Sequence, residues 1–279
     1  FVLRTNANLS DDEAVAKMGH PTVYVPPELR WLVQEDRIES RRRKYMLTIR
    51  KSGERGHANH GWLDSYHSFS FANYYDPAHM GYRALRVINE DRIAEGRGFG
   101  SHPHRDMEIL TYVLSGKLAH KDSMGHVEVL GPNEIQRMSA GTGVVHSEFN
   151  GSENEPVHLL QIWIEPKTNG TAPGYEQLKF EASEKLDRFK LLASPKPVAG
   201  AATINQDASL LVAEMTPGKK LSYPLGDARH AWLQVIRGEV AVNGKTLSAG
   251  DAVAADKEQQ LEITAQGTTN SEVLLFDLA

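Results

Sequence analysis

Two pairs of ligand-type side chains stand out in the sequence, because the members of each pair are two residues apart. The first pair is His102 and His104, in the segment GRGFGSHPHRDME. Side chains at positions i and i+2 of an extended strand project from the same face, with Cα atoms about 6–7 Å apart. Two imidazoles at this spacing can bind one metal ion at about 2.0–2.2 Å.

The second pair is His146 and Glu148, in the segment SAGTGVVHSEFN. Two such pairs on facing strands would supply three neutral ring nitrogens and one carboxylate, and would leave room for exogenous ligands. Spacing also allows a second glutamate to be the carboxylate ligand in place of Glu148. Glu108 lies four residues after His104 and has the same strand parity, so spacing does not choose between Glu108 and Glu148.

Other histidines of the chain are interpreted as surface residues or as buried residues whose hydrogen bonds are satisfied. His67, in the segment WLDSYHSFSF, is the one that we single out as a candidate pocket wall. The residues interpreted as neither ligands nor pocket walls are His57, His60, His79, His120, His126 and His158.

The composition restricts the chemistry of the site. The chain has 279 residues, no cysteine and a formal net charge of −5. The absence of cysteine excludes disulfides, thiolate metal sites and cysteine nucleophiles, so a metal must be held by histidine and carboxylate. The net charge gives no reason to expect direct nucleic-acid binding. No apolar run is long enough to cross a membrane and the start lacks a secretory pattern, so we expect a cytoplasmic protein.

The chain divides into four segments by its pattern of apolar, charged and turn-forming residues. Residues 1–45 form an N-terminal extension with a helix-like stretch at about 28–44 that ends in a basic run. Residues 46–170 have the short apolar runs typical of β-strands and contain both ligand pairs. Residues 171–189 are predicted to be a linker with one short helix, and residues 190–279 again have the pattern of β-strands.

Short apolar runs that end in turn residues predict an antiparallel sandwich or barrel. The run at 109–114 is apolar on both parities, as expected of a strand covered on both sides, and 157–164 is similar. Residues 69–71 are predicted to form a short strand, and DSMG at 122–125 is predicted to form a hairpin turn.

An internal repeat relates the two β segments. TYVLSGKLAHKDSMGHVEVLGPNEI is echoed by LQVIRGEVAVNGKTLSAGDAV, so that Gly116 matches Gly238 and Gly131 matches Gly250. The second copy lacks all of the candidate ligands, and we therefore expect metal in the first copy only. The residues at the corresponding positions are Pro224, Gly226, Ala265 and Gly267.

At these residues the sequence resembles the pirin family of bicupins. The matching strings are GHANHGWLDSYHSFSFANYYDP, GFGSHPHRDMEILTYVLSG, QRMSAGTGVVHSEFN and HLLQIWIEP. The resemblance implies an all-β fold of two cupin domains, which are jelly-roll-like antiparallel β-barrels packed face to face, with few short helices. It also implies that the fourth ligand is Glu148 rather than Glu108, and that His102, His104 and His146 hold the metal.

The resemblance is greatest to bacterial pirin-like quercetin 2,3-dioxygenases. It implies a metal-dependent enzyme that cleaves a flavonol such as quercetin with O2 and releases CO, with Glu148 as the catalytic base. We expect Fe(II), while Mn, Co, Ni, Cu or Zn would suit the same ligands. We also expect a monomer. The alternative is a metal- or redox-responsive regulatory protein of the pirin type, with a protein partner and incidental dioxygenase activity.

Overall fold

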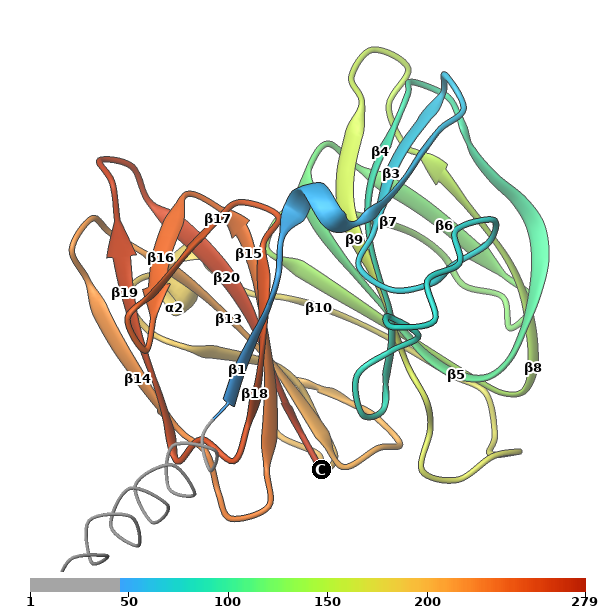
Figure 1. Ribbon diagram of the computed structural model, residues 1–279. Helices are drawn as coiled ribbons and strands as arrows, with labels where there is room; N and C mark the ends of the chain where they lie inside the picture. Colours follow the sequence, from blue (N-terminus) through green and yellow to red (C-terminus); the bar gives the residue numbers. More distant parts are fainter. Residues whose placement is uncertain (1–45) are drawn as a thin grey trace, which may run out of the picture. The chain divides into compact units, whose positions relative to one another are not determined.

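The computed structural model describes residues 46–279, so the predicted extension 1–45 and its helix-like stretch 28–44 lie outside the described residues. Within 46–279 almost every element is a strand, as predicted (Figure 1). The one α-helix in this part of the chain is α2 (Ala182–Lys185), and a single 3-10 turn spans Ser52–Glu54. No helix in the same part is long and apolar enough to cross a membrane.

The first half of the described chain builds a nine-stranded sheet in the order β2-β3-β4-β9-β5-β8-β6-β7, with β10 paired to β8. Neighbouring strands of this sheet are antiparallel. Its strands are β2 (Gly56–Asn59), β3 (Leu63–His67), β4 (Leu85–Ile93), β5 (Gly98–Ser115), β6 (Leu118–Asp122), β7 (Val127–Leu130), β8 (Glu134–Asn150), β9 (Val157–Ile164) and β10 (Gly174–Lys179).

The second half builds a seven-stranded sheet, β1-β18-β15-β20-β13-β11-β12, and a four-stranded sheet, β14-β19-β16-β17. None of the three sheets closes into a ring, so the predicted barrels are open along their strand order. The strands are β1 (Met46–Arg50), β11 (Lys190–Ser194), β12 (Ala202–Thr203), β13 (Ala208–Met215), β14 (Lys220–Pro224), β15 (His230–Arg237), β16 (Glu239–Val242), β17 (Lys245–Ser248), β18 (Ala252–Asp256), β19 (Gln260–Gln266) and β20 (Ser271–Leu278).

Two edge strands belong to sheets to which the sequence pattern alone would not assign them. β1 begins the segment predicted as the first cupin domain, yet it pairs with β18 in the second half. β10 lies in the predicted linker, 171–189, and pairs with β8. The predicted helix in that linker is confirmed but is only one turn long.

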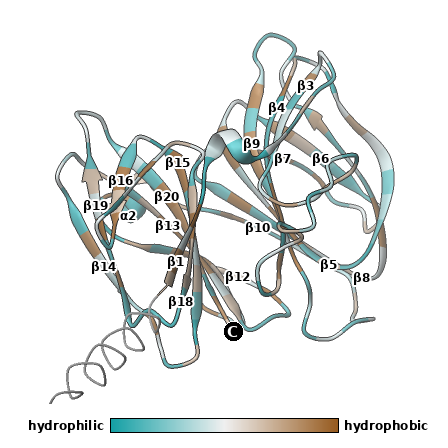
Figure 2. Ribbon diagram, in the orientation of Figure 1, coloured by the Kyte–Doolittle hydropathy of each residue, from teal (hydrophilic) through white to brown (hydrophobic). Residues whose placement is uncertain are grey.

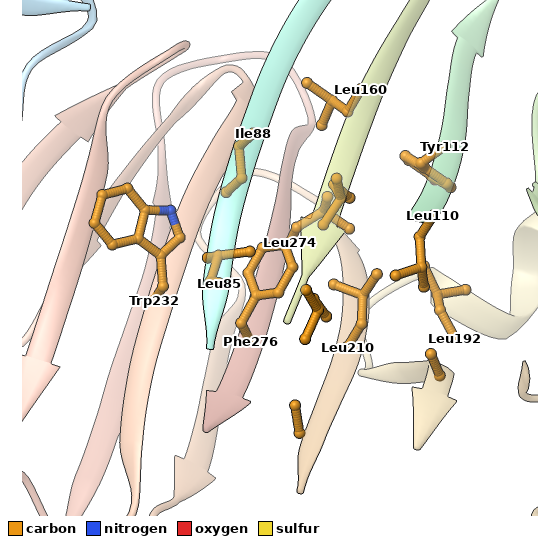
Figure 3. Close-up of a cluster of buried hydrophobic side chains, with 14 of the residues drawn as sticks. Leu85, Ile88, Leu110, Tyr112, Leu160, Leu192, Leu210, Trp232, Leu274 and Phe276 are labelled. Atoms are coloured by element: carbon orange, nitrogen blue, oxygen red, sulfur yellow. The ribbon is translucent and has the colours of Figure 1, made fainter. Parts of the chain in front are cut away.

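The two halves pack sheet against sheet through one apolar cluster, which Figure 3 shows in close-up. Leu110 and Leu160 contribute to it from β5 and β9, and Leu210 and Phe276 contribute from β13 and β20. Residues 109–113 of β5 are buried and Leu114 is partly buried, in agreement with the prediction of a strand covered on both sides. Figure 2 shows the matching pattern, with apolar segments along the strands of both halves. Burial of this cluster therefore couples the two halves.

The interiors of the two halves differ in what fills them. In the second half an apolar cluster that includes Leu233, Leu261 and Ile263 occupies the space between the sheets. The pair β14–β19 corresponds in the repeat to the start of β5 paired with the end of β8, and it places Leu221 opposite Ile263. The equivalent strands of the first half place His102 opposite His146. The second copy thus has an apolar interior where the first has histidines.

The segment at 69–71 is not a strand, and that prediction is wrong. Its backbone bonds locally instead, since the N–H of Ser70 donates to the carbonyl of His79 and the N–H of Phe71 donates to that of Tyr74. The predicted turn at 122–125 is confirmed, because the N–H of Gly125 donates to the carbonyl of Asp122 at 3.2 Å.

The shared apolar cluster leads to a prediction about stability. Leu110 is fully buried in it. Replacement of Leu110 by Ala should lower the free energy of unfolding by about 2–5 kcal/mol, because it removes apolar contacts and leaves a cavity. Urea unfolding measures this change. The control is Val127→Ala, at a side chain that is 69% exposed, where the change should stay within about 0.5 kcal/mol. Equal effects at the two positions would contradict the packing described here.

Candidate metal centre

Three histidine rings meet between β5 and β8. His102 and His104 come from the start of β5, and His146 comes from β8 directly opposite His102 in the strand register. The ring centroids of His102 and His146 are 4.4 Å apart, and His104 lies 4.8 Å from each of the other two. Their nearest ring nitrogens all lie within 4.8 Å of one another, which suits a shared cation. The structure therefore brings the three predicted histidines together.

Glu148 follows His146 on the same face of β8 and is buried. Its Oε2 accepts a hydrogen bond of 2.7 Å from the Nε2 of Gln161 on β9. The side-chain oxygen of Gln161 in turn accepts from the hydroxyl of Thr111 at 2.8 Å. This chain of bonds holds the carboxylate beside His146, and its second oxygen stays available.

Buried polar atoms without partners provide the test of whether these residues fit a metal ion. Both ring nitrogens of His146 and the Oε1 of Glu148 are buried and have no hydrogen-bond partner within the described residues. Unpaired buried polar groups are costly and usually have a partner in the native state. Nitrogen and carboxylate donors of this kind are what divalent first-row metals bind, so the donor set fits.

Glu108, the alternative that spacing left open, lies elsewhere. A register shift interrupts β5 between His104 and Asp106, and Asp106 has a positive φ of 65°. A bulge of this kind adds a residue and reverses the parity of the side chains that follow. Glu108 therefore faces away from the histidines, where its Oε2 accepts a 2.7 Å hydrogen bond from the hydroxyl of Ser139.

Two glycines near the site are required by close approach of the backbone. A Cβ at Gly98 would lie 2.2 Å from the carbonyl oxygen of Glu148 and 2.4 Å from the Cα of Phe149. A Cβ at Gly141 would lie 2.2 Å from the carbonyl oxygen of Thr171, and its φ is 48°. These glycines let β5 and the Thr171 loop contact β8 on both sides of the ligands. At Gly100 a Cβ would meet nothing within 4 Å.

Most other histidines have the hydrogen-bonded role that was predicted. His79 pairs with Asp76 at 2.8 Å, and His158 pairs with Glu90 at 2.9 Å. His120 differs, because its Nδ1 is buried without a partner and its ring lies 5.3 Å from that of His146. His120, His146 and Glu148 form a second group whose ligand atoms lie within 4.8 Å of one another. Spacing could not reveal this neighbour, which comes from β6.

The histidine cluster opens onto a cavity of about 810 Å³ in the first half. His102, His104 and Glu148 form part of its wall. His67 also lines it, so its predicted role as a pocket wall is confirmed, whereas His57 and His60 line it as well and were interpreted only as surface or core residues. Strands β2, β3 and β4 together with the loop at 71–74 supply most of the remaining wall, which the sequence did not indicate.

A chain of aromatic contacts runs along this cavity from the metal centre. The ring of His104 meets Trp163 edge to face at 4.9 Å, and Trp163 meets Phe71 edge to face at 5.4 Å. Phe71 lies 5.4 Å from His67. Elsewhere on the wall, Trp62 contacts Phe99 at 5.4 Å. Walls of this kind suit a flat aromatic ligand.

Burial sets the protonation states of the site. It lowers the pKa of His104 to about 4 and that of His146 to about 3, and the neighbouring histidines add to the effect. Both rings are therefore neutral at pH 7 and ready to bind metal. Burial, and then the charge of Asp91, raises the pKa of Glu148 to about 7.

Family models match most of the chain. Residues 48–164 match the model described as Pirin, and residues 191–278 match the model described as Quercetinase C-terminal cupin domain.

Curated relatives match over nearly their whole length. Over 233 residues the chain is 50% identical to a quercetin 2,3-dioxygenase of Escherichia coli K12, covering 84% of this chain and 99% of that protein. It is 42% identical to a pirin-like protein of Caulobacter vibrioides, covering 80% of this chain and 96% of that protein.

Solved structures agree with these matches. YhhW from Escherichia coli superposes with a TM-score of 0.80 at 50% identity, covering 84% of this chain and 98% of that one. A structure of bacterial pirin YhhW in complex with nickel(II) superposes with a TM-score of 0.79 at 49% identity, covering 84% of this chain and 99% of that one.

The geometry predicts which substitutions remove metal. His104→Ala should abolish stoichiometric binding, because it takes away one of three converging rings, and elemental analysis of reconstituted protein measures the loss. His79→Ala is the matched control, since His79 bonds to Asp76 outside the cluster. His120→Ala should also retain metal. If it loses as much as His104→Ala, the ion binds in the second group instead.

The pKa values predict how metal affinity depends on pH. Below about pH 7 the metal-free protein holds a proton on Glu148, and a metal that binds the carboxylate must displace it. Affinity should therefore fall about tenfold per pH unit below that value. Because the pKa values of His104 and His146 are lowered, protons compete with the metal for these rings only at lower pH. Competition titrations between pH 5 and 8 test this, and Glu148→Gln should flatten the slope near neutrality. An unchanged slope in this variant would exclude Glu148 as the titrating ligand.

Proposed function

The chain belongs to the pirin family, and we propose that it acts as a metal-dependent quercetin 2,3-dioxygenase with His102, His104, His146 and Glu148 as the metal ligands. The observation that carries this proposal is that the histidine cluster opens onto a large aromatic-lined cavity. The 50% identity to the Escherichia coli quercetin 2,3-dioxygenase supports the same substrate class, a flavonol together with O2.

The metal in this proposal is Fe(II). The nickel(II) complex of the related bacterial pirin supports a divalent ion in this fold, and nitrogen and oxygen ligands distinguish poorly among Fe, Mn, Co, Ni, Cu and Zn. When bound, the ion supplies Lewis acidity toward the hydroxyl of the flavonol and the redox chemistry that O2 requires. The net reaction consumes flavonol and O2 and releases CO.

Glu148 serves as the general base in this mechanism. In the metal-free protein burial raises the pKa of Glu148 to about 7, so this carboxylate takes up a proton more readily than an exposed glutamate does. Glu148 would leave the metal partly, and its unpartnered Oε1 would then accept the proton of the flavonol hydroxyl. Gln161 keeps the other oxygen fixed through its hydrogen bond, so the carboxylate remains oriented while the proton moves.

The cavity wall contributes position and shape. Trp163 and Phe71 meet edge to face next to His104, which leaves a ring face available to a flat substrate. Contact with these side chains would shield one face of the reacting ring from water. A purely regulatory metal protein has no need of such a cavity, so the geometry favours the enzyme over the regulatory alternative.

Activity measurements test the proposal directly. Fe(II)-loaded protein given quercetin should take up O2 and release CO in equal amounts. Glu148→Gln should lower kcat by about 10²–10⁴-fold, because the base is lost. Glu108→Gln is the matched control, since Glu108 is also buried but bonds to Ser139, and it should retain activity. Wild-type protein that releases no CO, or equal loss in the two variants, would contradict the proposal.

A further inference from the structure

Two cross-strand pairs of polar side chains form a separate part of the cavity wall. Ser65 on β3 lies directly opposite Asp91 on β4, and His67 lies directly opposite Asn89. All four are buried and all four line the cavity. Polar side chains are costly to bury, so a polar patch inside an aromatic-lined cavity calls for an explanation.

The first pair is largely satisfied within the protein. The hydroxyl of Ser65 donates a short hydrogen bond to Asp91. The carboxyl of Asp91 also lies close enough to raise the pKa of Glu148. This pair therefore belongs to the surroundings of the metal centre.

The second pair has unused hydrogen-bonding capacity. The Nδ1 of His67 lies 2.8 Å from the side-chain oxygen of Asn89. An amide oxygen only accepts, so the proton must be on Nδ1, and the Nε2 of the neutral ring is then an acceptor. Burial lowers the pKa of His67, which keeps the ring neutral at pH 7. Neither this Nε2 nor the amide nitrogen of Asn89 bonds to any residue that the structure describes.

This pair presents an acceptor and a donor side by side to the cavity. A phenolic hydroxyl has the complementary character, since it donates one hydrogen bond and accepts another. The aromatic chain from His104 through Trp163 and Phe71 reaches His67. A flat ligand that lies along this chain, with one end at the metal, would bring its other end to the pair.

We propose that His67 and Asn89 form a subsite for a phenolic hydroxyl on the part of the substrate that does not bind the metal. The inference rests on the proposed function and narrows it, because the protein then prefers flavonols with further hydroxyls to unsubstituted ones. The Nε2 of His67 accepts from that hydroxyl, and the amide of Asn89 donates to it. Both are specificity-determining residues, and neither takes part in the chemistry at the metal.

The experiment compares quercetin with 3-hydroxyflavone, which keeps the metal-binding hydroxyl and lacks the others. Asn89→Leu removes the amide at similar size, and His67→Phe removes the ring nitrogens while it keeps the contact with Phe71. Asn270→Leu is the matched control, because it makes the same change and breaks a hydrogen bond to Glu214 in the second half. The readouts are anaerobic binding to the metal-loaded protein and kcat/KM in air.

Each cavity variant should weaken quercetin binding and lower its kcat/KM by about three- to tenfold. The values for 3-hydroxyflavone should stay within a factor of two. Equal losses for both compounds, or no loss for quercetin, would overturn the subsite. The control should change neither compound. If wild-type protein releases no CO from either compound, the proposed function fails, and the anaerobic binding pattern alone then decides the subsite.

Discussion

The antiparallel pairing of β5 with β8 is the constraint on which the site depends. Its register sets His102 directly opposite His146, and the two-residue period of each strand adds His104 and Glu148 on the same face. The carboxylate is then held by Gln161 on β9, the other neighbour of β5. A slip of one residue in this register would turn one ligand pair away from the other. The arrangement of the proposed ligands is therefore a consequence of the pairing of β5 with β8, which lie side by side in Figure 1.

The repeat shows how one fold can supply both a support and a site. In the repeat, Pro224 and Ala265 stand where the first half has His102 and His146, and the interior of the second half is filled with apolar side chains. The seven-stranded sheet of the second half packs against β4, β5 and β9 through the shared apolar cluster. Gln161 and Trp163 of β9, together with His102 and His104 of β5, line the cavity. The second half thus stabilises the strands that carry the proposed ligands, and the first half contains the cavity.

The sequence predicted the parts that depend on local periodicity. The two i, i+2 pairs, the buried strand at 109–114 and the turn at 122–125 follow from residue types at fixed spacing, and the structure agrees. Parity across β5 could not be predicted, because the bulge near Asp106 reverses it and displaces Glu108. Only the resemblance to pirins favoured Glu148 over Glu108 as the carboxylate ligand.

Contacts between strands that are distant in the sequence could not be predicted from local residue patterns either. The approach of His120 to His146 depends on the β6–β8 pairing, and the polar wall at His67 and Asn89 depends on the β3–β4 pairing. The exchange of the edge strands β1 and β10 likewise reflects tertiary packing.

The most direct test of the central claim is anomalous diffraction at the metal edge from crystals of the Fe(II)-loaded protein. The account predicts a single peak at about 2.0–2.2 Å from ring nitrogens of His102, His104 and His146 and from an oxygen of Glu148. A peak bound by His120 without His102 and His104, or one outside the first half, would contradict it.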